Sequence, residues 1–173
     1  MKSAWRLTLA LMIAMTLAAC QTTPEAEPEP EPAPDTSTDV DTSGAPDPRD
    51  YTDARNFDNP ESLLSKRVIY FDFDKSTVRP EYRGIVSAHA AYAGANSTAR
   101  VTLEGHADER GTREYNLALG ERRANSAKNY LVGLGVDAGR ISTVSYGKER
   151  PKALGSNEQA WAQNRRAVSV VVN

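Results

Sequence analysis

The sequence predicts a single α/β (α+β) domain, a two-layer sandwich, that occupies the part of the 173-residue chain after residue 58. Three observations predict it. Apolar runs typical of strands alternate with segments of helical periodicity, in the order strand, helix, strand, helix, strand, helix, strand. The length suits one ordinary domain plus tails. The segment before residue 58 is rich in proline and acidic residues and offers little apolar surface to bury. Elements that alternate in this way pack as helices on a sheet.

The first half of the domain is predicted to form a strand, a helix and a second strand. Residues 68–73 are an apolar run rich in β-forming residues, as expected for a strand covered on two sides. Pro80 opens a helix, because its missing N–H costs nothing in the first turn, and Gly94 is expected to end it. Polar and apolar residues alternate over residues 101–106, which indicates a half-buried strand. The buried stripe of the helix is expected to be Tyr82, Ile85, Val86, His89 and Tyr92.

The second half begins with the longest predicted helix, over residues 116–134, which Gly135 ends. A strand over residues 141–146, a short helix over residues 157–163 and a last strand over residues 167–172 complete the order. Small residues on the long helix are expected to let it lie close to the sheet. Its predicted buried face consists of Leu117, Gly120, Ala124, Ala127, Leu131 and Leu134.

The N-terminus is typical of an export signal. Lys2 and Arg6 precede an apolar run over residues 7–19, which is shorter than the roughly 20 residues that a membrane-spanning helix needs. The run ends at Cys20, the only cysteine of the chain, so no internal disulfide is possible. Residues 17–20 resemble the lipobox of bacterial lipoproteins, which implies cleavage after residue 19 and a lipid anchor on Cys20. Gln21 in place of aspartate favours the outer membrane. The alternative is a soluble periplasmic protein with an incidental cysteine.

Charge is distributed unevenly along the chain. Residues 21–58 hold 11 acidic residues and two basic ones, whereas residues 59–173 hold 17 basic and 12 acidic residues, a net charge of 17 − 12 = +5. The acidic and proline-rich segment is expected to stay extended and disordered, with a reach of up to roughly 100 Å. The sequence therefore predicts a spacer over residues 20–57 and a basic domain that suits an anionic partner. The export signal argues against nucleic acid as that partner.

Five motifs follow one another in the predicted domain. They are YFDFDK at residues 70–75, GHADERGT at 105–112, ERRAN at 121–125, SYGK at 145–148 and NRR at 164–166. Together they resemble the OmpA-like peptidoglycan-binding domain, over essentially all of residues 59–173. The resemblance implies a mixed four-stranded sheet. It divides the chain into a signal peptide (1–19), a lipidated linker (20–57) and an OmpA-like domain (58–173).

The resemblance also implies a function. Members of this family bind peptidoglycan non-covalently through the diaminopimelate residue of the stem peptide. The lipobox and the spacer agree with the lipoprotein members of the family and not with the porin-like ones. Those lipoproteins face the periplasm from the outer membrane, tether that membrane to the cell wall, and act in the Tol–Pal system with Tol proteins such as TolB, in envelope integrity and in membrane invagination during division.

The residues themselves suggest how a zwitterion is bound. Asn116 and Arg123 are seven positions apart, so they share one helix face, about 10.5 Å apart. Asp108 lies in the loop before that helix, where binding groups are common. The resemblance assigns the ligand ammonium to Asp108 and the ligand carboxylate to Arg123. It places the remaining residues, Asn116, Asp74, Phe73 and Arg165, around the pocket. Substituting Asp108 or Arg123 by alanine is expected to abolish binding and to leave the melting temperature nearly unchanged.

Other interpretations stay open at this stage. Asp108 and Arg123 could form only a surface ion pair. An enzyme acting on peptidoglycan could use His106, Asp108 and Glu109, although no serine or cysteine nucleophile motif appears. With two histidines and no ligand cysteine, neither a metal nor a cofactor is expected. His89 is expected to be a hydrogen-bonded core residue. Arg110, Arg113 and Arg122 are interpreted as solvated charge or as a face for another protein. A flagellar stator relative would need a transmembrane helix.

Overall fold

The computed structural model describes residues 44–172. Within that range four strands form one sheet, in the order β1-β4-β2-β3. β4 pairs antiparallel with both β1 and β2, and β2 pairs parallel with β3, so the sheet is mixed. The strands are β1 (Val68–Tyr70), β2 (Arg100–His106), β3 (Ile141–Gly147) and β4 (Arg166–Val172). The predicted signal peptide, Cys20 and residues 20–43 of the predicted linker lie outside the described residues.

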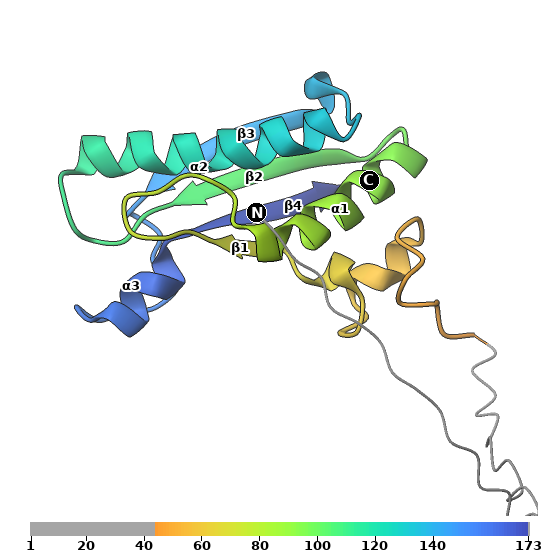
Figure 1. Cartoon of the computed structure of the whole chain (residues 1–173), viewed down its shortest axis with the longest axis horizontal. Coiled ribbons are helices and arrows are strands. Elements are labelled where there is room, and N and C mark those ends of the chain that lie inside the picture. Colours follow the sequence, from red (N-terminus) through yellow and green to blue (C-terminus); the bar gives the residue numbers. More distant parts are fainter. Residues whose placement is uncertain (1–43, 173) are drawn as a thin grey trace, which may run out of the picture. The chain divides into compact units, whose positions relative to one another are not determined.

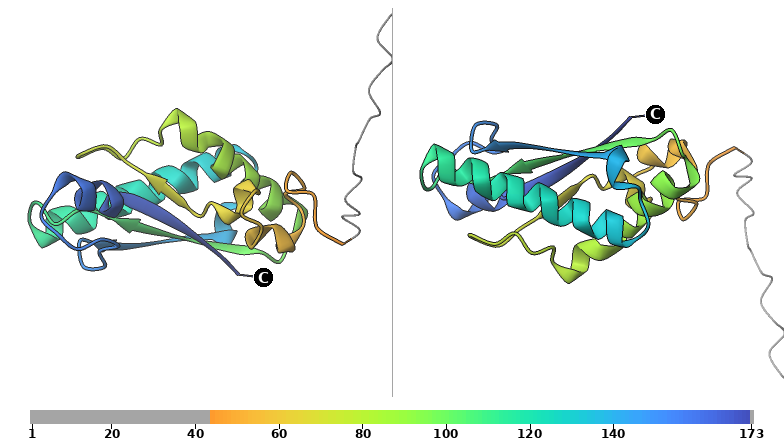
Figure 2. Two further views of the ribbon diagram at one scale, coloured as in Figure 1. Left: turned by 90° about the horizontal axis from the view of Figure 1, so that it is seen from below. Right: turned by 90° about the horizontal axis from the view of Figure 1, so that it is seen from above.

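Two long helices pack together with the sheet around one apolar core, and a short third helix lies at one end of the sheet (Figures 1 and 2). The helices are α1 (Arg83–Ala95), α2 (Arg113–Gly133) and α3 (Glu158–Asn164). Short 3-10 turns precede β1, α1 and β3. The predicted two-layer α/β architecture, its element order and its mixed four-stranded sheet are confirmed.

The boundaries of the helices differ from the prediction by a few residues, and capping explains the start of α2. α2 begins at Arg113, before residue 116, because the hydroxyl of Thr112 accepts a hydrogen bond from the N–H of Tyr115 at 3.2 Å and caps the helix there. Gly94 does not end α1. The helix continues to Ala95, and the N–H of Asn96 still donates to the carbonyl of Tyr92.

The predicted buried face of α2 is correct at its small residues and at Leu131 but wrong at its two ends. Leu117 and Leu134 are 48% and 47% exposed, whereas Gly120, Ala124 and Ala127 are buried against the sheet. Positions 116, 119 and 123 take part in the buried stripe instead. Two of these hold polar side chains, Asn116 and Arg123, so a search for apolar residues could not find them.

Packing begins upstream of residue 58. Asn56 is fully buried, and its amide nitrogen donates to the carbonyls of Asp47 and Asp50, both at 2.7 Å. The ring of Phe57 packs edge-on against Tyr92 of α1, with centroids 4.7 Å apart. Residues 44–57 therefore contribute to the folded part of the chain, at the end of the sheet opposite α3 (Figure 1).

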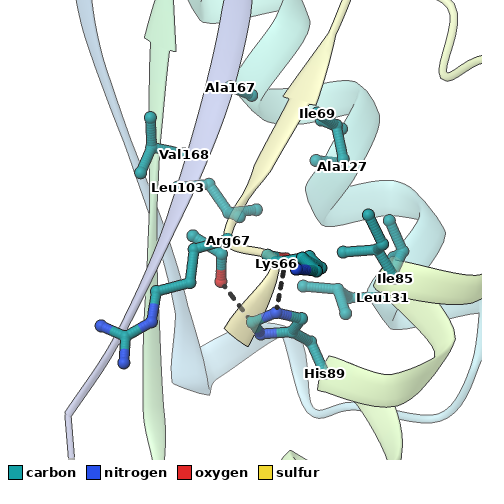
Figure 3. A pocket seen from close by; sticks show the side chains of 12 residues that line it. Lys66, Arg67, Ile69, Ile85, His89, Leu103, Ala127, Leu131, Ala167 and Val168 are labelled. Atoms are coloured by element: carbon teal, nitrogen blue, oxygen red, sulfur yellow. Dashed lines mark hydrogen bonds between the residues drawn. The ribbon is translucent and has the colours of Figure 1, made fainter. Parts of the chain in front are cut away.

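His89 of α1 is a core residue, as predicted. The residue is 3% exposed, and it lines a pocket together with Ile69, Ile85 and Leu131 (Figure 3). Nε2 donates to the carbonyl of Lys66 at 3.3 Å, and Nδ1 lies 3.5 Å from the Ser169 hydroxyl. Burial lowers the pKa of His89 to about 4. Burial, together with the nearby Arg166, lowers the pKa of His106 on β2 to about 4 as well.

The lowered pKa values of these two histidines predict that the folded protein loses stability in mild acid. Both are uncharged in the folded protein until about pH 4 but titrate near 6.5 when the chain unfolds. The unfolded state therefore binds more protons between these values, and stability that is complete above pH 6.5 is lost as the pH falls toward 4. From pH 6.5 to 5 we expect a loss of roughly 2 kcal/mol for each histidine. Thermal melts at several pH values check this. His89→Gln should flatten the slope, and an unchanged melting temperature between pH 7 and 5 contradicts it.

Candidate functional site

A cavity of about 140 Å³ lies between the segment after β1, the loop after β2 and the start of α2. Five of the six predicted binding residues line it. The sixth, Arg165, does not, but its Nη1 lies 3.5 Å from the Asp108 carboxylate. Four residues that the sequence analysis did not assign to the site also line it: Arg110, Gly111, Tyr115 and Leu119. The lining consists of Phe73, Asp74, Asp108, Arg110, Gly111, Tyr115, Asn116, Leu119 and Arg123.

Asp108 is the anionic group of the cavity. It is 4% exposed, and its carboxylate accepts hydrogen bonds from Arg110: from the backbone N–H and Nε at 3.1 Å, and from Nη2 at 2.6 Å. Nη1 of Arg165 lies 3.5 Å from it. Burial alone raises the pKa of this carboxyl, but the hydrogen bonds from Arg110 and Arg165 outweigh burial and hold the pKa below its ordinary value. Asp108 is therefore ionised at neutral pH.

Arg110 is the cation closest to Asp108, and its role was missed. Its guanidinium carbon lies 4.1 Å from the ring centroids of both Phe73 and Trp161, so it is held between two aromatic rings. It is part of the cavity wall, not solvated charge. The spacing of Asp108 and Arg110, two positions apart in a turn, is a weak local signal for this pairing. The aromatic contacts depend on the tertiary fold and leave no such signal.

Arg123 is fully buried on α2, and its guanidinium is anchored to backbone carbonyls. Nε donates to Lys75 at 2.9 Å, Nη1 to His106 at 2.7 Å, and Nη2 to Asp72 at 3.2 Å. Burial lowers its pKa to about 10. Among the described residues, the ion pairs of Asp108 are with Arg110 and Arg165, so the alternative of an Asp108–Arg123 surface pair is wrong. Three of the five N–H groups of the guanidinium thus fix the cavity wall, and Arg123 is itself one of the residues that line the cavity.

The other predicted residues position the loops around the cavity. The amide nitrogen of Asn116 donates to the carbonyl of Arg110 at 2.8 Å and so fixes the turn that carries Asp108. Asp74 has a left-handed backbone (φ 55°), and its carboxylate accepts a short hydrogen bond from the Tyr115 hydroxyl. Arg165 donates from Nε to the carbonyl of Phe71 at 3.1 Å and from Nη2 to Glu158 at 2.6 Å.

The residues of the enzyme alternative are not gathered at one cavity. His106 is 2% exposed, and its Nε2 lies 3.9 Å from Glu104 on the same strand. Glu109 accepts a hydrogen bond from the indole N–H of Trp161 at 2.9 Å. Neither residue lines the cavity that holds Asp108. His106 and Glu109 are therefore not gathered with Asp108 at that cavity. None of the helices within residues 44–172 has the length and apolar character to cross a membrane.

Comparisons with known proteins agree on the fold and on the region that holds the site. The model of the OmpA family matches residues 70–165, a range that includes all six predicted binding residues. The chain is 57% identical to the peptidoglycan-associated lipoprotein of Haemophilus influenzae over 101 residues, 58% of this chain and 66% of that protein. It is 52% identical to the peptidoglycan-associated lipoprotein of Pseudomonas aeruginosa over 105 residues, 61% of this chain and 62% of that protein. The match thus spans slightly less than two thirds of either relative.

A solved structure gives the same picture. The crystal structure of the peptidoglycan-associated lipoprotein from Burkholderia pseudomallei aligns with a TM-score of 0.65 at 45% sequence identity. The alignment covers 67% of this chain and 98% of that one. The folded part of this chain is therefore similar to that domain over nearly its whole length.

Proposed function

The chain belongs to the OmpA family, and on that premise we propose that it binds peptidoglycan non-covalently and tethers the outer membrane to the cell wall. The observation that carries the proposal is a small cavity in which an ionised Asp108 lies beside Arg110 and Arg123. Opposite charges at one cavity suit a ligand that carries both an ammonium and a carboxylate. The names of the relatives, peptidoglycan-associated lipoproteins, support the same polymer as the ligand.

We propose that the part of peptidoglycan in the cavity is the diaminopimelate residue of the stem peptide. In this arrangement its ammonium donates to Asp108, and its carboxylate accepts from Arg110 and Arg123, which both line the cavity. Asn116, Asp74, Phe73 and Arg165 hold the surrounding loops. Each charge-assisted hydrogen bond contributes roughly 1.5–3 kcal/mol, so affinity at one site is modest. A repeating polymer next to a membrane-anchored protein makes modest affinity sufficient.

Asp108→Asn tests this function, because it removes the charge and keeps the shape. We expect binding of a diaminopimelate-containing muropeptide to weaken by roughly 10- to 100-fold, since one charge-assisted hydrogen bond is lost. Titration calorimetry measures the affinity. Asp137→Asn is the matched control, because Asp137 is exposed beyond the other end of α2. Unchanged affinity in Asp108→Asn rules out the site assignment. Release of soluble products from purified peptidoglycan by the unmodified protein favours the enzyme alternative.

We further propose that Cys20 carries the lipid that anchors the protein in the outer membrane, and that residues following it span the distance to the wall. Two or more acyl chains anchor stably where one does not. Cys20→Ser should therefore move the protein from the membrane fraction to the soluble periplasmic fraction and leave muropeptide affinity unchanged. Fractionation and immunoblotting check this. A Cys20→Ser protein that stays in the membrane fraction contradicts the anchor.

By the same resemblance we propose a role in the Tol–Pal system, with Tol proteins such as TolB as partners and membrane invagination during division as the process. Co-purification of a Tol protein with the full chain tests the partner.

A further inference from the structure

A second hollow lies on the other side of the segment that follows β1. It measures about 290 Å³, and its wall includes Tyr70, Asp72, Arg79, Tyr82, Gln163 and Arg165. We propose that this groove binds a sugar ring of the glycan strand to which the stem peptide is attached. The proposal rests on the proposed function, because it assigns the glycan part of the same polymer to the hollow beside the cavity.

The groove and the charged cavity share a wall. Phe71 and Asp72 line the groove, whereas the next two residues, Phe73 and Asp74, line the cavity. Arg165 also connects them, because it lines the groove while its Nη1 lies 3.5 Å from the Asp108 carboxylate. A ligand held at Asp108 therefore lies against the wall that the cavity shares with the groove.

The charges of the groove favour a neutral ligand. Nη1 of Arg79 lies 3.5 Å from the carboxylate of Asp72, and Nη2 forms a close ion pair with Glu81. Arg165 is paired with Glu158 and Asp108. Both cations of the groove thus already have anionic partners, so a second charged amino acid gains little there.

The aromatic residues of the groove favour a sugar among neutral ligands. Tyr70 and Tyr82 are half-buried, with ring centroids 6.3 Å apart and planes tilted by 57°. The C–H face of a sugar ring packs on an aromatic ring, and its hydroxyls bond to polar groups at the edge. Gln163 of the groove wall, a residue of α3, supplies an amide for such bonds. The guanidinium of Arg79 lies 5.7 Å from the centroid of the Tyr82 ring, and Nζ of Lys152 lies 5.4 Å from that of Tyr70, so the sugar would pack on the ring faces that these cations leave uncovered.

The experiment compares two probes on the full chain carrying Cys20→Ser. One probe is a stem tripeptide that contains diaminopimelate, and the other is the same tripeptide on its disaccharide. We expect the disaccharide probe to bind about 3- to 10-fold more tightly, as one aromatic contact provides. Tyr82→Ala should remove this preference and leave tripeptide affinity within about twofold, since Tyr82 does not line the cavity.

Tyr51→Ala is the matched control, because Tyr51 packs with Leu64 in a separate cluster. Gln163→Ala is the second variant if Tyr82→Ala does not fold, because Gln163 of α3 is only partly buried; it should reduce the preference in the same direction. If the chain that carries only Cys20→Ser binds both probes with equal affinity, the proposal of a sugar-binding groove is wrong, and the proposed function is unaffected. A preference that persists in either folded variant also overturns it. If neither probe binds, the proposed function fails and the groove fails with it.

Discussion

Arg123→Met is expected to lower the melting temperature by roughly 10–15 °C, because the free energy of unfolding falls by roughly 3–5 kcal/mol. Methionine fills much of the same volume but donates no hydrogen bonds. The carbonyls of Lys75, His106 and Asp72 then lose their donors in a buried setting, and each buried carbonyl without a partner costs about 1–3 kcal/mol. Differential scanning calorimetry measures the shift. The sequence alone predicts an unchanged melting temperature for this position, and the burial of the side chain reverses that expectation.

Arg122→Met is the matched control for Arg123→Met. Arg122 is the preceding residue of α2 and is exposed, with its guanidinium 5.8 Å from the Tyr115 ring. Its loss should change the melting temperature by no more than about 2 °C, as for an ordinary surface substitution. If the two variants have the same melting temperature, Arg123 does not hold the segment after β1 and the loop after β2 in place. Binding by Arg123→Met should be measured below its own melting temperature, where a lost ligand contact can be told apart from unfolding.

The order of strands and helices could be predicted because apolar periodicity records which face of each element meets the core. The same rule explains the error on α2. Its buried stripe runs through Asn116 and Arg123, two polar residues whose hydrogen bonds go to backbone carbonyls. A rule that seeks apolar residues replaced them with Leu117 and Leu134, which are exposed. Polar residues on a buried helix face can be identified only when the three-dimensional positions of the carbonyls that they bind are known.

The candidate site was predicted in part for a similar reason. Asp108 and Asn116 lie in a short loop and the helix that follows it, so sequence proximity already brings them together. Arg110 was interpreted as solvated charge because nothing near it in the sequence shows the rings of Phe73 and Trp161, which come from the segment after β1 and from α3. The aromatic contacts that hold Arg110 in the cavity wall were therefore the part of the site that only the fold could reveal.

Gly105→Ala is expected to prevent folding or to reduce the free energy of unfolding by at least about 4 kcal/mol. A Cβ on Gly105 would lie 1.8 Å from the carbonyl oxygen of Gly120, where β2 and α2 meet backbone to backbone. β2 cannot move aside, because β3 and β4 pair with it on both sides. α2 cannot move away without losing the packing of Ala124 and Ala127. Any displacement of α2 also moves Asn116 and Arg123, so the binding site is lost together with the core.

Gly94→Ala separates this close approach from a general effect of removing glycine. A Cβ at Gly94 meets nothing within 4 Å, and alanine in an α-helix is about 1 kcal/mol more favourable than glycine. Gly94→Ala should therefore raise the melting temperature slightly, whereas Gly105→Ala should yield insoluble or unfolded protein. Soluble expression, far-UV circular dichroism and thermal melts of the two variants compare them. A folded Gly105→Ala protein with a near-native melting temperature would show that α2 and the sheet can separate. Close packing would then not explain why α2 carries small residues on its buried face.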